Sequence, residues 1–488
     1  MSSSLESLHA ECEANLRAGR PQVVARRLAG LTLARIPREW VLRLANVCRR
    51  AGLFTPGMKI LAKVVHPENP RSAIQATSEE LAEYAVLLQR SGAVKEAVHT
   101  LSKVDPAKVP EANLYRAFCH FGTWDAANAI SCLEDYTRSP ISAYSLLVGQ
   151  VNLAAAYIMG EQLAEAMELI EKNIEAAGAN NYTRLLGNSL ELRAQAHLRR
   201  GNIGAAKASL EQASQVFAGA QTLDELFVLK WQAIISGMES GDPAPILEFR
   251  ELAAKRKAYE AVREADLFAV GVRFDERRFD HLMFGTPFAA YRSRIVRETD
   301  RTPEREEYLL GPEGSRCFDL LTGHIEGREL FPEGRKCHQL VEILLRDFYV
   351  PQRIGGLFAE LFPNEYFDIF SSPSRVHQII RRTRRVLESE NVPVKILVEG
   401  GQFLLKTEGE FSFKVPLERH SVDGHSKNFE ALRLCFSSEK EFTAKEARES
   451  LGLPRTSFQR FVNWALENGR VEKISAHNAT RYRLKHAA

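Results

Sequence analysis

The feature that most constrains the fold of this chain is a turn glycine that recurs between apolar-periodic segments of its N-terminal half. A small residue follows each glycine five or six positions later. A glycine permits a tight turn, and a small residue early in the next helix lets two helices approach closely. The pattern therefore predicts consecutive helical hairpins over residues 1–242. The turn glycines are Gly19, Gly52, Gly92, Gly122, Gly160 and Gly201, and the small residues are Ala25, Gly57, Ala97, Ala127, Ala166 and Ala206.

These turns recur at a spacing that is typical of helical repeats. Successive glycines lie 30 to 41 residues apart, near the ~34-residue period of tetratricopeptide repeats. The segment AHLRRGNIGAAKASLEQA, residues 196–213, resembles that family. The resemblance implies an α-solenoid whose concave surface binds a protein or peptide partner. A plain helical spacer without a ligand is the alternative.

Residues 243–306 continue the helical pattern and are predicted to form a helical extension or connector. Their segment AAKRKAYEAVRE, residues 253–264, interleaves charges of both signs. We interpret it as a solvated helix face rather than a nucleic-acid patch. The apolar runs separated by glycine turns after residue 307 indicate strands, which places a domain boundary near residues 300–306.

Residues 371–406 have the pattern of a basic amphipathic helix followed by a β-hairpin. Ser372 is a suitable N-cap and Pro373 a suitable first helical residue. Apolar residues then recur at helical spacing on one face, while cationic and polar residues occupy the other. Residues 394–398 and 402–406 flank a Glu-Gly-Gly turn, which indicates two antiparallel strands. A helix that is apolar behind and cationic in front suits a reader of the DNA major groove.

The order of elements over residues 307–407 is strands, three helices and a hairpin, and this stretch resembles the OmpR-type winged-helix domain. CFDLLTGHIEGREL resembles that family's second and third strands, SRVHQIIRRTRRVLE its recognition helix and VKILVEGGQFLLK its wing. Gln402 and Phe403 replace the more usual Gly-Tyr of the wing, and Thr383 stands where leucine is common. These departures leave the fold intact but make the base preference unreadable.

The charges of residues 371–406 point to contact with DNA. Seven Lys or Arg against three Glu give this stretch a local charge of +4, and cations gain affinity by releasing counterions from phosphates. A solvated basic face on a structural helix is the alternative. The resemblance favours His377, Arg381 and Arg382. Candidates for base edges or nearby phosphates are His377, Gln378, Arg381, Arg382 and Arg385, and candidates for phosphate contacts are Arg375, Arg384 and Lys395.

A second winged helix is predicted over residues 428–488, after a linker at 408–427. Three helical segments and a hairpin with its tip at residues 476–479 follow one another, and LPRTSFQRFVNWALENGRVEKI resembles the recognition helix and first wing strand of many bacterial regulators. Twelve Lys or Arg against seven Glu give residues 427–485 a charge of +5. Dimerisation or intramolecular packing is the alternative role. The DNA-binding candidates are Arg455, Thr456, Ser457, Arg460 and Asn463 on the helix and Arg481 and Arg483 on the hairpin.

Composition limits the remaining possibilities. Lys and Arg total 65 against 62 Asp and Glu, a formal net charge of +3, so any affinity for nucleic acid must be local. The chain lacks the phosphate-binding and nucleophile motifs that an enzyme would need, and we expect no catalytic residue, cofactor or metal. Seven scattered cysteines without a C-x-x-C pair are interpreted as reduced thiols. We find neither a signal peptide nor a membrane span and expect a cytoplasmic protein that associates with the nucleoid when bound to DNA.

Together these patterns predict a mainly α protein: an N-terminal α-solenoid of tetratricopeptide-like helical hairpins followed by two α+β winged-helix domains. The predicted function is a non-enzymatic transcription regulator. Double-stranded DNA is the expected ligand of the winged helices, and a protein or peptide is the expected partner of the repeats. A homodimer is possible. The rival interpretation is a scaffold protein whose winged helices bind other proteins.

Overall fold

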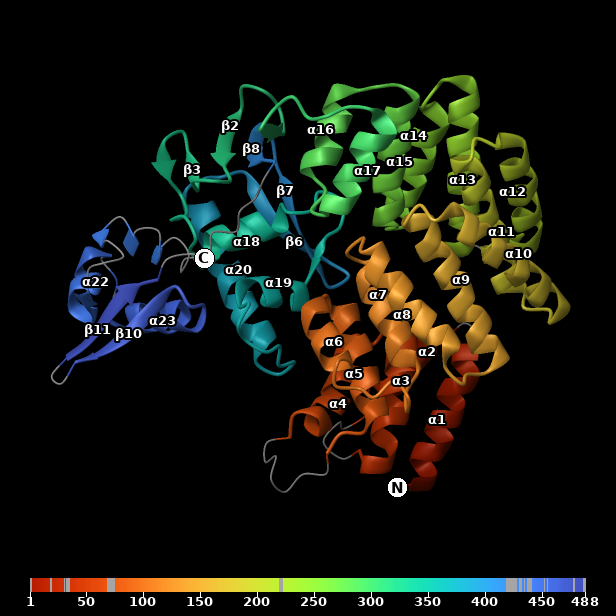
Figure 1. The fold of residues 1–488 in the computed structure, drawn as a ribbon, viewed down its shortest axis with the longest axis horizontal. Helices are drawn as coiled ribbons and strands as arrows, with labels where there is room; N and C mark the ends of the chain where they lie inside the picture. The colour runs from red at the N-terminus through yellow and green to blue at the C-terminus, as the bar shows by residue number, and fades with distance from the viewer. Residues whose placement is uncertain are drawn as a thin grey trace.

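The computed structural model describes residues 2–17, 20–29, 31, 36–67, 75–218, 223–417, 428–429, 432–433, 435–436, 441–451, 453, 455–476 and 479–485. These residues form a mainly helical protein whose sheets lie in the C-terminal part of the chain (Figure 1). The described helices include none long and apolar enough to cross a membrane.

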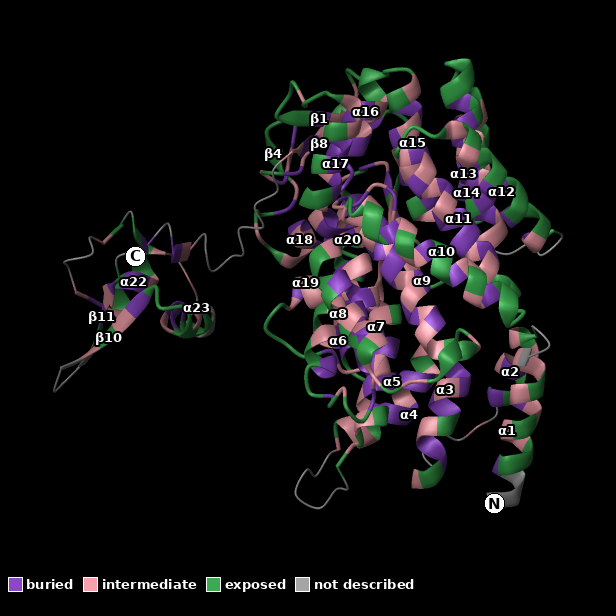
Figure 2. Ribbon diagram, turned by 45° about the vertical axis from the view of Figure 1, so that its right-hand side comes forward, coloured by how far each residue is buried: buried purple, intermediate pink, exposed green. Residues whose placement is uncertain are grey.

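The described residues up to Thr299 form helices that stack in chain order into a curved array (Figure 1). Residues coloured as buried lie mostly where neighbouring helices face one another, and residues coloured as exposed lie mostly on the outside (Figure 2). The helices are α1 (Ser2–Arg17), α2 (Pro21–Leu28), η2 (Arg38–Trp40), α3 (Val41–Arg50), α4 (Phe54–Val65), α5 (Ser78–Ser91), α6 (Val94–Leu101), α7 (Glu111–Phe121), α8 (Ala126–Arg138), α9 (Ala143–Met159), α10 (Leu163–Ala179), α11 (Thr183–Arg199), α12 (Ile203–Phe217), α13 (Leu223–Ser240), α14 (Ala244–Lys255), α15 (Tyr259–Val272), α16 (Glu276–Phe284) and α17 (Ala289–Thr299).

The predicted turn glycines that the structure describes fall between helices, but they do not all play the same role. Gly52, Gly92 and Gly201 have positive φ angles of 76°, 94° and 76°, which glycine adopts most readily. In the turns that contain Gly122 and Gly160, the left-handed residues are instead Trp124 and Glu161. Gly19 lies outside the described residues. Glycine at the Gly122 and Gly160 turns therefore does not supply the left-handed position.

The small residues after the turns mostly lie where the second helix meets the first. Gly57, Ala97, Ala166 and Ala206 are buried, as close helix approach requires. Ala25 is half-buried. Ala127 is exposed, and the buried small residue of its helix is Ala129. The prediction for Ala127 was wrong because the buried face of α8 is formed by Ala129, Ile130 and Leu133, and Ala127 lies off that face.

Residues 243–306 are not a separate connector. One hydrophobic core contains residues from α11 to α17, including Leu190, Ile246 and Ile295. The boundary predicted at residue 242 therefore falls inside a continuous core, because helices α14 to α17 bury their apolar faces against α13 and one another.

The first helix–hairpin unit, residues 307–417, combines three helices with two sheets. The larger sheet has the strand order β1-β8-β2-β3-β4, and the smaller one has the order β5-β7-β6. Its elements are β1 (Glu307–Leu310), β2 (Arg316–Asp319), β3 (His324–Ile325), β4 (Arg328–Glu329), α18 (Lys336–Leu344), β5 (Gln352–Arg353), α19 (Ile354–Leu361), α20 (Ser372–Ser389), β6 (Val394–Glu399), β7 (Gln402–Thr407) and β8 (Phe411–Pro416).

Strand β8 corrects the predicted linker at residues 408–427. It runs antiparallel to β1 and parallel to β2, in the sheet formed by residues that precede the helices. Phe411, Phe413 and Val415 are buried. They share a core with Val341 of α18 and Leu387 of α20, so the unit ends at residue 417 rather than 407. The rest of the predicted linker, residues 418–427, lies outside the described residues.

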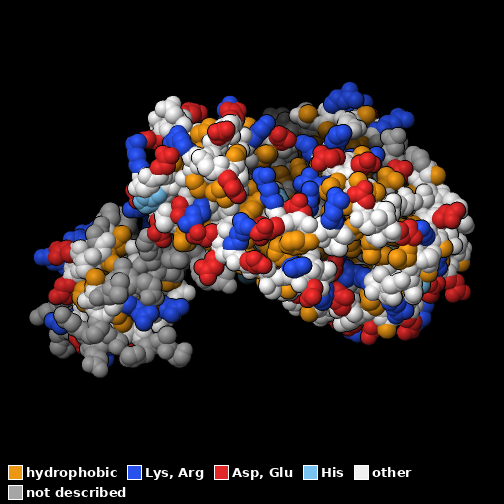
Figure 3. All heavy atoms as spheres, turned by 90° about the horizontal axis from the view of Figure 1, so that it is seen from above, with side chains coloured by type: hydrophobic (Ala, Val, Ile, Leu, Met, Phe, Trp, Pro, Cys, Tyr) orange, Lys and Arg blue, Asp and Glu red, His pale blue; other side chains and the backbone are white. Residues whose placement is uncertain are grey.

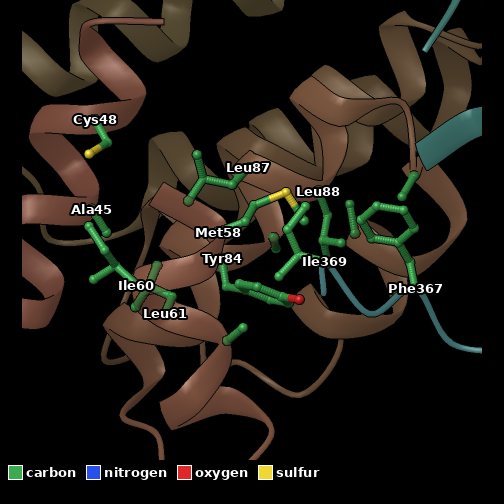
Figure 4. Close-up of a cluster of buried hydrophobic side chains, with 14 of the residues drawn as sticks. Ala45, Cys48, Met58, Ile60, Leu61, Tyr84, Leu87, Leu88, Phe367 and Ile369 are labelled. Atoms are coloured by element: carbon green, nitrogen blue, oxygen red, sulfur yellow. The ribbon is translucent and has the colours of Figure 1, made fainter. Parts of the chain in front are cut away.

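The first helix–hairpin unit shares a hydrophobic core with the N-terminal helices. This core joins residues of α3 to α7 to Leu357 and Phe358 of α19, Ile379 of α20 and Phe403 of β7. In Figure 4, Phe367 and Ile369 lie against Leu88 and its neighbours from the helical array. Side chains of α5 and α6 are thus buried by the unit, so this junction is an interior rather than a loose contact between domains.

The second helix–hairpin unit, residues 428–485, contains β9 (Phe442–Thr443), α22 (Ala444–Ser450), α23 (Arg455–Glu467), β10 (Val471–Ala476) and β11 (Ala479–Leu484). Its sheet has the order β10-β11-β9. Helix α22 begins with a capping box between Thr443 and Glu446. The hairpin tip lies at residues 476–479 as predicted, and the two residues at its centre, 477 and 478, lie outside the described part of the chain. Phe458, Phe461 and Val462 face the unit's core.

Candidate nucleic-acid interface

Helix α20 presents two chemically distinct faces. Its buried residues are Ser372, Val376, Ile379, Ile380, Thr383 and Leu387. The hydroxyl of Thr383 donates a hydrogen bond to the Ile379 carbonyl at 3.0 Å, so this buried polar group is satisfied. The helix begins at Ser372, one residue earlier than predicted, and the Ser372 hydroxyl accepts a hydrogen bond from the Asp368 backbone nitrogen at 2.9 Å. The start of α20 is therefore fixed by the loop before it.

The opposite face of α20 carries the candidates for base contacts. His377, Gln378, Arg381, Arg382 and Arg385 are all exposed. Within the described part of the chain, none of the three arginines forms an ion pair or a side-chain hydrogen bond. Their guanidinium groups keep all five N–H donors available to a ligand. This face is the part of the candidate interface that the sequence pattern predicted most directly.

The three predicted phosphate contacts are engaged within the protein. Arg375 bonds Glu365, with one contact at 2.8 Å, and lies over the Phe362 ring with its guanidinium carbon 4.0 Å from the ring centroid. This hydrogen bond holds the pKa of Glu365 below its ordinary value. Arg384 donates to the Ile396 carbonyl at 2.5 Å, and Lys395 pairs with Glu408 at 2.8 Å. Sequence spacing did not reveal these partners, because each lies outside α20 or outside the strand that carries the cation.

The β6–β7 hairpin lies beside α20. Gly400 and Gly401 form its two-residue turn with φ angles of 58° and 78°, which explains the Gly-Gly pair. Phe403 of β7 is buried, and its ring centroid is 5.9 Å from that of His377. The bond from Arg384 to the Ile396 carbonyl ties the helix to β6. These contacts fix the position of the β6–β7 hairpin relative to α20.

The tip of this hairpin also touches the helical array. Lys257, in the turn before α15, lies 3.7 Å from the Glu399 carboxylate. The hydroxyl of Tyr259 donates to the Gln402 side-chain carbonyl at 3.4 Å. The segment 253–264, interpreted from its sequence as a solvated helix face, therefore includes residues that contact the hairpin tip.

The loop that leads into α20 is held by the first helices. The Glu96 carboxylate of α6 accepts a hydrogen bond from the Phe367 backbone nitrogen at 2.8 Å. The Tyr366 hydroxyl lies 2.6 Å from the His66 ring, after the end of α4. Burial raises the pKa of Glu96 to about 7 and lowers the pKa of His66 to about 4. Two groups that titrate away from their usual range thus lie where the array meets this loop.

A buried charge network joins α15 to the segment after α18. Arg263, which is fully buried, donates to Asp347 at 2.5 Å. The Tyr349 hydroxyl donates to Asp266 at 3.0 Å. The Arg263 guanidinium also lies 5.2 Å from the Tyr349 ring centroid. These contacts cross between the array and the first helix–hairpin unit, so the two parts are joined through α15 as well as through α5 and α6.

Helix α23 carries the candidates of the second unit. Arg455, Arg460 and Asn463 are exposed, and Asn463 accepts a hydrogen bond from Gln459 at 3.0 Å. The side chains of Thr456 and Ser457 lie outside the described part of the structure. On the hairpin, Arg481 and Arg483 both approach Glu441, at 3.7 Å and 3.1 Å. The hairpin arginines are thus paired, whereas the helix keeps exposed cations.

The surface as a whole does not carry one sign of charge. Figure 3 shows basic and acidic side chains interspersed over the visible face. Among the described residues, no group of three His, Cys, Asp or Glu could hold a metal ion. In comparisons with known proteins, the chain matches no family model and no curated protein sequence. The functional assignment therefore depends on the local geometry of α20 and its surroundings.

Proposed function

We propose that this protein is a DNA-binding transcription regulator in which an OmpR-type winged helix, residues 307–417, is carried by a tetratricopeptide-like α-solenoid. In this proposal α20 is the recognition helix and β6–β7 the wing. The second helix–hairpin unit is a further winged helix with α23 as its recognition helix. Two DNA-binding modules on one chain raise the effective concentration of the second once the first is bound.

The observation that carries the proposal is the exposed arginine face of α20. Arg381, Arg382 and Arg385 point away from the core and lack ion-pair partners among the described residues. Exposed arginines without ion-pair partners contribute nothing to packing. Phosphates and guanine edges, in contrast, accept hydrogen bonds from such guanidinium groups. Arg375, Arg384 and Lys395 act in this proposal by positioning the helix and hairpin.

The repeats are proposed to bind a protein or peptide partner and to regulate DNA binding. Part of their surface is covered by the first helix–hairpin unit through α5 and α6. The hydrogen bond from Phe367 to Glu96 links these repeats to the loop before α20. A partner that shifts α6 would move this loop, and with it the start of the recognition helix.

The test is fluorescence anisotropy of the full chain with random-sequence duplex DNA across a salt series. A fragment of residues 300–488 is unsuitable because it lacks helices α3 to α7. Apolar side chains of α19 and α20 that pack against those helices would be exposed in the fragment. We expect tight binding at low salt that weakens steeply as salt rises. The double substitution Arg381→Ala and Arg382→Ala removes two cations and should lower the log–log salt slope by about 1.8.

A matched control replaces two arginines that lie outside the candidate interface, in the helical array. Arg138 on α8 and Arg184 on α11 are 69% and 74% exposed and lie in the helical array. The Arg138→Ala and Arg184→Ala protein has the same net charge as the α20 variant and should bind DNA like the wild type. Equal losses in both variants would show that net charge, not α20, drives binding.

The scaffold function is the second candidate, and one observation favours it. The first helix–hairpin unit already makes an extensive protein contact, with the helical array of its own chain. A scaffold would show no salt-dependent affinity for duplex DNA and would instead form a stable protein complex. The anisotropy series therefore distinguishes the two candidates.

A further inference from the structure

The turn between α14 and α15 carries three consecutive cations beside the hairpin tip. Lys255, Arg256 and Lys257 are all exposed. Lys257 pairs with Glu399 of the hairpin at 3.7 Å. Within the described residues, Lys255 and Arg256 have no ion-pair or side-chain hydrogen-bond partner. The turn therefore has two positive charges next to the proposed wing that lack an ion-pair partner among the described residues.

Nearby acidic groups do not neutralise these two cations. Glu251 bonds Arg250 at 3.1 Å, and Glu260 lies 3.5 Å from Arg263. Glu399 is the partner of Lys257. Because Lys257 offsets the charge of Glu399, the hairpin tip and the turn together form a surface with a net positive charge.

The turn is fixed in position relative to α20. Tyr259 bonds Gln402 at the tip, and further along α15 Arg263 bonds Asp347 in the unit that contains α20. The bond from Tyr349 to Asp266 adds a third tie. The distance and direction from the α20 face to the cations of the turn are therefore fixed. A ligand that binds the α20 face and extends past the hairpin tip would contact these cations.

We propose that Lys255 and Arg256 form an additional DNA-contacting surface, contributed by the helical array, that binds backbone phosphates of the duplex held by α20. This inference rests on the proposed function. Duplex DNA carries one negative charge per about 1.7 Å along its axis, so a duplex that extends beyond the hairpin tip offers phosphates to the turn. These contacts add affinity without base preference.

The simpler role of these cations is to stabilise α14. Lys255 is the last residue of the helix and Arg256 its C-cap, where positive charge interacts favourably with the helix dipole. That role would affect the free energy of unfolding but not the salt dependence of DNA binding. The two roles therefore predict different results for the same variant.

The experiment compares three full-length proteins in the anisotropy salt series with random-sequence duplex: wild type, Lys255→Ala with Arg256→Ala, and Lys172→Ala with Lys207→Ala. Lys172 and Lys207 are exposed. They belong to α10 and α12, helices that lie on the far side of the array from the β6–β7 hairpin (Figure 1). We expect the turn variant to lose about 1.8 from the log–log salt slope and the control to keep the wild-type slope. Thermal unfolding of each protein checks that it is folded.

The outcomes separate this inference from the proposed function. A turn variant with the wild-type slope and affinity overturns the inference but leaves DNA binding by α20 in place. An equal loss in the control variant also overturns it, because net charge would then explain the effect. A wild-type protein that does not bind duplex DNA at low salt overturns both.

Discussion

The Glu96 carboxylate accepts a hydrogen bond from the backbone nitrogen of Phe367 at 2.8 Å, across the junction between α6 and the loop before α20. The other carboxylate oxygen of Glu96 is buried without a hydrogen-bond partner among the described residues. A buried carboxylate with one unsatisfied oxygen holds its proton more tightly than in water. The junction that positions the proposed recognition helix therefore contains a group that titrates near neutral pH.

Glu96→Gln should remove a pH dependence of stability. The pKa of Glu96 rises from 4.5 to about 7 on folding, so stability is lost as pH rises from about 4.5 to about 7. His66, whose pKa falls from 6.5 to about 4, has the opposite effect between about pH 4 and 6.5. Above pH 6.5 His66 no longer contributes, and we expect Glu96 to account for about 0.5 kcal/mol of the decline between pH 6.5 and 8 after solvent screening. Burial also raises the pKa of Glu260 to about 7, but the decline from Glu260 is common to the wild type and the variant.

Urea denaturation of the wild type and the Glu96→Gln variant at pH 6.5 and pH 8 checks this prediction. The glutamine side chain keeps a carbonyl acceptor for the Phe367 nitrogen, so the contact itself survives the substitution. A variant that loses as much stability as the wild type between these pH values would exclude Glu96 as the titrating group.

Asp347→Asn should destabilise the protein strongly. The substitution keeps an acceptor for the Tyr349 and Val350 backbone nitrogens but removes the closer of the two carboxylates that face buried Arg263, leaving Glu260 at 3.5 Å. Breaking a buried ion pair costs about 3–5 kcal/mol, and we expect the lower end of this range because Glu260 remains. Urea denaturation measures the loss, and Asp224→Asn is the control, because its partner Arg184 is 74% exposed and such pairs contribute about 0–1 kcal/mol. Equal effects of the two substitutions would contradict a buried ionic junction.

Gly355→Ala should weaken the contact between α19 and the α5–α6 turn. A Cβ at this position would lie 2.7 Å from the Ser91 hydroxyl oxygen, 2.8 Å from its carbonyl oxygen and 3.0 Å from the Ala93 nitrogen. The backbone must move to relieve this, at a cost of about 1–3 kcal/mol in unfolding free energy. Gly204→Ala in α12, where a Cβ meets nothing within 4 Å, should instead stabilise the protein by about 0.5–1 kcal/mol. Thermal unfolding of both variants tests the pair, and a stabilised Gly355→Ala protein would argue against close packing here.

Arg384→Ala should weaken DNA binding by releasing the hairpin rather than by removing a phosphate contact. Its guanidinium donates to the Ile396 carbonyl, which the alanine variant would leave without this partner. We expect reduced affinity with a salt slope close to that of the wild type. Arg382→Ala is the comparison, because it should lower the slope by about 0.9. A similar loss of slope in Arg384→Ala would instead place this arginine on a phosphate.

Sequence patterns predicted the helices and hairpins well where the residue types of the turns and the periodicity of the apolar residues indicate the same element. The hairpin was placed correctly because the Gly400–Gly401 turn and the flanking apolar strands specify it locally. Strand β8 was missed although Phe411, Phe413 and Val415 alternate with other residues, because its partners β1 and β2 lie roughly 100 residues away and its neighbours resemble a linker.

The candidate interface was predicted unevenly for a similar reason. Burial of one face of α20 follows from helical spacing, so the exposure of Arg381, Arg382 and Arg385 could be predicted. The partners of the three predicted phosphate contacts could not, because each pairing depends on how separate segments pack. The position of Lys255 and Arg256 beside the hairpin could not be predicted for the same reason.

The sequence by itself determined the helices, the turns, the hairpins and the two faces of α20, because hydrophobic periodicity and turn chemistry act over a few residues. Only the tertiary structure decided that the first helix–hairpin unit shares a core with α3 to α7 and is tied to α15 by Arg263 and Asp347. These two residues lie 84 positions apart, and nothing local in the chain specifies their contact. Which arginines remain free for a ligand follows from that packing, since burial and pairing are properties of the assembled surface.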